Sequence, residues 1–112
     1  MKNNKQAFRD YLQLEKNYSP HTVNGYLKDL DFFFIFIQET FDQENLLEVN
    51  YSQIRSWIVS LVDAELSNTS VNRKIASLKS FYKFLLKTKQ IELNPLLKHK
   101  ALKTPKKIQI PF

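Results

Sequence analysis

The 112-residue chain contains no cysteine, a single glycine, four prolines and two histidines. Without cysteine there is no disulfide framework, thiolate metal site or cysteine nucleophile, and two distant histidines do not suggest a zinc site. One glycine argues against a turn-dense β fold. The longest apolar run, Phe32 to Ile37, is far too short to span a membrane. The composition favours one soluble helical domain without metal or cofactor.

Positive charge is concentrated in the second half of the chain. Residues 1–50 carry five Lys/Arg against eight Asp/Glu, a net charge of −3, whereas residues 51–112 carry twelve against three, a net charge of +9. A basic half attracts nucleic acid or another polyanion. Charge alone fits equally well a helix whose lysines only keep the protein in solution.

Apolar residues recur at three- and four-residue steps in four segments, which predicts four helices. Ser19, Asn50 and Ser67 have the side chains of N-caps, Pro20 suits a first helical position, and Gln53 completes a capping box with Asn50. The predicted helices are Asn4 to Lys16, Pro20 to about Thr40, Asn50 (the cap) to about Ala64, and Asn68 to Lys89. A short turn over Pro95 to Lys98 follows, and residues 99–112 have the composition of a linker.

The second predicted helix has two unusual features. Its second half is apolar nearly all round, so Phe32, Ile35 and Phe36 are expected to lie between other helices or against a partner. Its interior holds Gly25, which costs about 1 kcal/mol relative to alanine. Close approach of a phosphate backbone and close approach of another helix both explain that glycine.

The fourth predicted helix has a basic outer face with small residues among the cations. The helical wheel places on the exposed arc Asn72, Arg73, Ala76, Ser80, Lys83 and Lys87, with Ser77 and Lys79 at its edges. Such a low surface could enter a DNA major groove, with lysines on phosphates and with Asn72 and Arg73 reaching base edges. A solvated lysine face is the alternative.

The start of the second helix is a further candidate for anion binding. His21 and Thr22 lie in its first turn, where free N–H groups and the helix dipole favour a phosphate. Tyr11, Tyr26 and Tyr82 fall on buried stripes, and none has the neighbours of an activated nucleophile. With no paired carboxylates, metal cluster or phosphate loop, the chain itself is not expected to be an enzyme.

Three blocks of sequence, in order, resemble one known domain. The run from Tyr18 through His21, Thr22 and Tyr26 to Asp29-Leu30 is similar to the opening of the core-binding domain in tyrosine recombinases of the Xer-like and phage-integrase-like group. The second block, Ser70 to Leu85, resembles a later helix of that domain, with its Asn-Arg, Phe-Tyr and Phe-Leu pairs. The third block, which resembles the exit toward the catalytic domain, comprises Asn94-Pro95, Pro105-Lys106-Lys107 and Pro111.

The resemblance implies an orthogonal, SAM-like bundle of four main helices that forms half of a C-shaped clamp on double-stranded DNA. Residues 1–98 would be the core-binding domain and residues 99–112 a linker toward a catalytic domain beyond Phe112. Family position and outer-face exposure together select as DNA-binding residues His21, Thr22, Gly25, Lys28, Asn72, Arg73, Ser77, Lys79, Ser80, Lys83 and Lys87. Asp29 matches the motif but is acidic, so it is expected to orient its neighbours.

The resemblance also implies partners and activity. The full protein would cut and rejoin DNA through a phosphotyrosyl intermediate, without metal, and would assemble with other recombinase protomers. The chain described here would bind DNA as a monomer in the cytoplasm, at the nucleoid and not at a membrane. A free-standing helical interaction module, which docks a partner on Phe32, Ile35 and Phe36, is the alternative, and a dimeric repressor is a third possibility.

Overall fold

The structure, a computed structural model, describes residues 2–102, and every regular element among them is helical. In chain order the elements are α1 (Lys2–Asp10), the π-helical turn η1 (Tyr11–Glu15), α2 (Pro20–Phe41), the 3-10 turn η2 (Leu46–Glu48), α3 (Tyr51–Asp63) and α4 (Asn68–Lys87). The predicted all-α fold with four main helices is therefore confirmed. The predicted exit residues Pro105, Lys106, Lys107 and Pro111 lie outside the described part of the chain.

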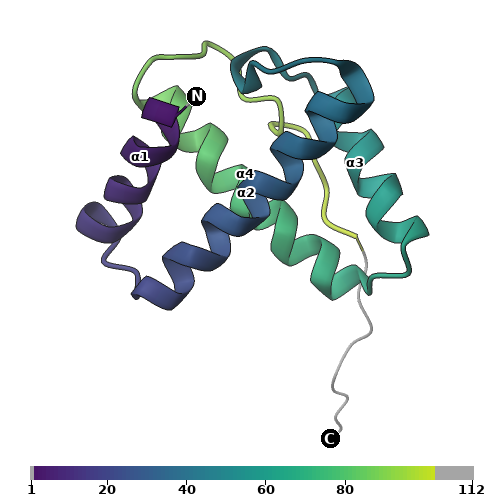
Figure 1. Ribbon diagram of the computed structural model, residues 1–112, viewed down its shortest axis with the longest axis horizontal. Coiled ribbons are helices and arrows are strands. Elements are labelled where there is room, and N and C mark those ends of the chain that lie inside the picture. The colour runs from purple at the N-terminus through teal and green to yellow at the C-terminus, as the bar shows by residue number, and fades with distance from the viewer. Residues whose placement is uncertain (1, 103–112) are drawn as a thin grey trace, which may run out of the picture.

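The two long helices, α2 and α4, cross near the centre of the molecule, with α1 on one flank and α3 on the other (Figure 1). After α4 the chain returns along the bundle between α4 and α3 (Figure 1). The crossing leaves the first half of α2 facing the first half of α4.

The helix starts follow the predicted caps. The Ser19 side chain accepts a hydrogen bond from the Thr22 amide at 3.2 Å, and Ser67 accepts one from the Ser70 amide at 3.1 Å. Asn50 and Gln53 form the reciprocal capping box, at 3.0 and 3.1 Å. Local side chains thus satisfy amides that the first turn of a helix leaves without partners.

Left-handed residues close the helices. Asp42 follows α2 with a φ of 52°, and Glu65 and Lys89, after α3 and α4, have φ values of 69° and 63°. At both of the latter ends the next amide reaches back to a carbonyl five residues earlier, as in a Schellman motif. This reversal ends α4 at Lys87, two residues before the predicted end.

Aromatic rings from all four helices pack together within a core that also contains many leucine, isoleucine and valine side chains. Phe8 of α1 packs edge-on against Phe81 of α4, with ring centroids 5.3 Å apart, and Phe33 of α2 packs against Trp57 of α3 at 5.0 Å. All four side chains are buried. Aromatic pairs of this geometry add to the stability supplied by burial.

The apolar second half of α2 is only partly covered. Phe36 packs against the core, whereas 48% of Phe32, 46% of Ile35 and 37% of Phe41 remain exposed. The expectation that Phe32 and Ile35 lie between helices of this chain is not met, because nearly half of each side chain is open to solvent.

Tyr82 carries the buried polar contact that ties the η2 turn to α4. Its hydroxyl donates to the Leu46 carbonyl at 2.9 Å, and burial raises the pKa of Tyr82 well above its ordinary value. Tyr82→Phe leaves that buried carbonyl without its donor, so the free energy of unfolding should fall by about 1–2 kcal/mol. Urea denaturation measures it, with an unchanged m-value as the check that the fold is intact. Full stability in this variant would contradict the contact.

Candidate nucleic-acid interface

A groove of about 710 Å³ lies between the first half of α2 and the first half of α4. Its α2 side comprises His21, Thr22, Asn24, Gly25, Tyr26, Lys28, Asp29 and Phe32, and its α4 side comprises Arg73, Lys74, Ala76 and Ser77. Six of the eleven predicted DNA-binding residues therefore share one surface.

Helical periodicity explains why these residues meet. His21, Gly25, Lys28 and Phe32 follow one another at steps of four, three and four residues, which places them in a row along one face of α2. On α4, Arg73 and Ser77 are separated by one turn. Because α2 and α4 cross, the two rows become opposite walls of the groove.

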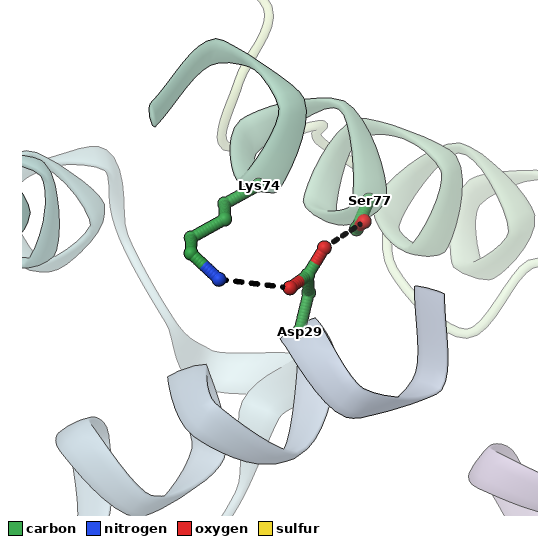
Figure 2. A network of polar contacts seen from close by, with 3 residues as sticks. All are labelled: Asp29, Lys74 and Ser77. Carbon is green, nitrogen blue, oxygen red and sulfur yellow. Dashed lines mark hydrogen bonds and ion pairs between the residues drawn. The ribbon is translucent and has the colours of Figure 1, made fainter. Parts of the chain in front are cut away.

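Asp29 joins the two walls (Figure 2). Its carboxylate accepts a hydrogen bond from the Ser77 hydroxyl at 2.8 Å and forms an ion pair with Lys74 at 3.1 Å. Both side chains of the ion pair are largely shielded from water, at 25% and 19% exposure, and Ser77 is 1% exposed. Asp29 thus orients its neighbours, as expected, while Ser77 donates into the helix contact and has little surface for DNA.

The electrostatics of the groove favour an anion. Lys28 and Arg73 are exposed, one on each wall, and neither has an ion-pair partner within residues 2–102. Lys74 is neutralised by Asp29 and also lies 5.4 Å above the Phe32 ring. Among residues 2–102, Lys28 and Arg73 are therefore the lining cations without an ion-pair partner, whereas the charge of Lys74 is balanced by Asp29.

Gly25 is exposed in this surface. A β-carbon added there would meet nothing within 4 Å, so no helix of the described chain requires glycine at this position. The interpretation that another helix of the same chain approaches Gly25 is therefore wrong.

The other five predicted residues lie outside the lining. Ser80 adjoins the groove through a hydrogen bond with Tyr26. Partial burial and the nearby Tyr18 raise the pKa of Tyr26, and the hydrogen bond with Ser80 opposes this rise. Asn72 bonds to the main chain of Leu102. Burial lowers the pKa of His99, and the charge of nearby Lys79 lowers it further. Lys83 is simply exposed.

Lys87 lies at the far end of α4, where it pairs with Glu15 at 2.9 Å and stands 5.2 Å from the centre of the Tyr11 ring. The Glu15 carboxylate raises the pKa of Lys87. This lysine ties α4 to the end of η1, a contact that a helical wheel of α4 alone cannot reveal.

Six lining residues were not predicted to bind DNA: Asn24, Tyr26, Asp29, Phe32, Lys74 and Ala76. Tyr26 falls on the apolar stripe of α2, so its periodicity predicts burial. Phe32 lies off that stripe and was expected to lie between other helices or against a partner. The available signal for Lys74 was its opposite charge to Asp29, but nothing in the sequence pairs two residues 45 positions apart.

Comparison with known families settles the affiliation of the domain. The family described as phage integrase, N-terminal SAM-like domain, matches residues 6–89. The chain belongs to this family. The matched span runs from α1 to the end of α4 and so contains both walls of the groove.

Several relatives of this integrase-type SAM-like domain are tyrosine recombinases named XerC. The chain is 41% identical to the tyrosine recombinase XerC of Oceanobacillus iheyensis over 91% of its own length and 33% of the relative's. It is 40% identical to the XerC of Pediococcus pentosaceus, over 79% and 29%, and 36% identical to that of Bacillus licheniformis, over 96% and 35%. The chain therefore spans about a third of these relatives. No solved structure matches it.

Two kinds of feature are absent from the described part of the SAM-like domain. None of its helices combines the length and the apolarity that crossing a membrane requires. Residues 2–102 also contain no group of three or more acidic, histidine or cysteine side chains placed to hold a metal ion.

The contact between the groove walls can be tested without any ligand. Asp29→Asn removes the counter-charge of the shielded Lys74, so the free energy of unfolding should fall by about 1.5–3 kcal/mol. The matched control is Asp31→Asn, on the same helix as Asp29. It breaks the exposed 2.9 Å ion pair between Asp31 and Lys5 of α1 and should cost less than about 1 kcal/mol. If urea denaturation shows the same loss of unfolding free energy for both variants, the Asp29 contact stabilises the fold no more than an exposed ion pair does.

Proposed function

We propose that this chain is the DNA-binding core domain of a tyrosine recombinase, and that the face around the α2–α4 groove lies against a recombination half-site. The observation that carries the proposal is a pair of cations, Lys28 and Arg73, which lie on opposite walls of one groove and have no ion-pair partner among residues 2–102. The family affiliation and the names of the XerC relatives support the same reading.

The two cations suit different parts of a duplex. Lys28 offers a compact charge for a phosphate, whereas the planar fork of Arg73 matches the O6 and N7 acceptors of guanine in the major groove. Ala76 beside Arg73 keeps the surface of α4 low, and Gly25 lets a phosphate backbone come close to α2. Thr22, Ser80 and exposed Lys83 border this face and would add phosphate contacts.

In this proposal the domain positions DNA and performs no chemistry. It holds one side of a half-site, as half of a clamp, while strand cleavage and rejoining belong to the part of a full-length recombinase that this chain does not span. Other protomers would assemble through the complete protein.

A second candidate function, docking of a partner protein, is favoured by the exposed apolar side chains Phe32, Ile35 and Phe41 on α2. The two candidates differ in their response to salt. DNA binding that neutralises phosphates weakens as salt rises, since bound counterions are released. Docking on apolar surface has no such dependence.

Titration of a fluorescent duplex at two salt concentrations tests DNA binding directly. If the domain neutralises only two phosphates, raising the salt concentration from roughly 50 to 200 mM should weaken its affinity for the duplex about tenfold. Arg73→Ala should weaken binding a further five- to hundredfold, about 1–3 kcal/mol, and should broaden the sequences recovered from randomised duplexes.

Lys87→Ala is the charge-matched control on the same helix. Because Lys87 is held by Glu15 at the far end of α4, its loss should change affinity by no more than about twofold. No binding at low salt, or salt-independent binding, would rule out the DNA proposal. Equal losses for the two variants would remove Arg73 from the interface.

Gly25→Ala separates stability from binding. With open space at the β-carbon, alanine should raise the free energy of unfolding by about 1 kcal/mol, because it favours the helix. The same methyl group should weaken DNA binding severalfold if a phosphate backbone approaches this position. Thr40→Ala, at an exposed site near the other end of α2, controls for added helix stability. A more stable Gly25 variant with full DNA affinity would exclude close approach at this glycine.

A further inference from the structure

Asn72 makes a contact that DNA binding does not use. Its side-chain amide donates to the Leu102 carbonyl at 2.9 Å and accepts from the Leu102 amide at 3.0 Å. A primary amide is the side-chain group that can pair with a peptide unit in this reciprocal way, because it donates and accepts in one plane. The pair joins residues 30 positions apart and occupies the atoms with which Asn72 would read a base.

The segment that Asn72 holds is anchored at two further points. Leu96, in the Pro95–Lys98 turn that the structure confirms, is 4% exposed, and Leu102 packs against the core. Midway between them, Nδ1 of His99 lies 2.9 Å from the Tyr51 hydroxyl at the start of α3, and the two rings are 5.8 Å apart. Leu96, His99 and Leu102, three residues apart, therefore each attach the segment to the bundle.

His99 is built into this contact. Its Nε2 is buried and has no hydrogen-bond partner within the described residues, and burial, with a contribution from Lys79, lowers the pKa of the ring. A neutral imidazole is therefore favoured, and it can share one hydrogen bond with Tyr51. A segment held by Leu96, His99 and Leu102 in this way is part of the packed domain.

We infer that Asn72 and Tyr51 form an exit clamp, which fixes the course of residues 96–102 and delivers the chain at Leu102 beside the start of α4. Asn72 is then a positioning residue and not a base contact. Its neighbour Arg73 lines the groove, so the clamp sets the direction of the chain at Leu102 relative to the groove face. That the clamp orients the remainder of a recombinase on DNA rests on the proposed function, whereas the clamp itself does not.

Amide hydrogen exchange of the 112-residue chain tests the clamp in the absence of DNA. In Asn72→Leu, a variant of similar size without hydrogen-bonding atoms, the Leu102 amide should exchange roughly tenfold faster or more, as expected when a hydrogen bond is lost by local opening. Trypsin should also cleave faster after the exposed Lys100. Core amides such as that of Leu78 should keep their protection, which shows that the variant folds.

Tyr51→Phe is the milder second variant, since it keeps the ring and removes only the hydroxyl contact with His99. It should increase cleavage after Lys100 less than Asn72→Leu does. Unchanged exchange at Leu102 in Asn72→Leu would overturn the clamp.

Duplex titration of the same variant separates positioning from base contact. With Asn72 as a positioning residue, Asn72→Leu should keep the duplex affinity and sequence preference of the unaltered chain to within about twofold, whereas Arg73→Ala should not. A loss of sequence preference equal to that of Arg73→Ala would overturn the assignment. If the unaltered chain binds no duplex, the proposed function fails, while the exchange result still decides the clamp.

Discussion

The contact of Asp29 with Ser77 and Lys74 is the constraint on which the interface depends. It is a polar link between the two walls of the groove. Without Asp29, Lys74 would be a largely shielded cation with no counter-charge, which is unfavourable because little water can solvate it. Because Asp29 neutralises Lys74, the cations of the groove lining that have no ion-pair partner among residues 2–102 are Lys28 and Arg73. A single carboxylate therefore shapes both the geometry and the charge of the surface.

Local sequence signals predicted the helices well, because caps and periodicity act over a few residues. Ser19, Asn50 and Ser67 begin helices as expected, and the apolar stripes form the core. The boundaries differ where the backbone reverses: Lys89 was assigned to the fourth helix but adopts the left-handed conformation that follows it.

The candidate site was predicted in part, for a physical reason. A helical wheel shows which residues share a face, but it cannot show what covers that face. Ser77 and Lys87 both lie on the polar arc of α4, yet Ser77 bonds to Asp29 and Lys87 to Glu15, which is 72 positions away in sequence. Asn72 likewise meets Leu102, at the end of a segment whose composition predicted only a linker. Each of these contacts depends on how the helices cross.

The central claim is that DNA lies on the face around the α2–α4 groove. Titration of the isotopically labelled chain with a short duplex, followed by amide chemical shifts, tests this claim most directly. The account predicts that the largest shifts gather near His21, Lys28 and Arg73, while the outer face of α3, around Val59, stays unchanged. Shifts concentrated on α3 or α1, with the groove unaffected, would contradict it.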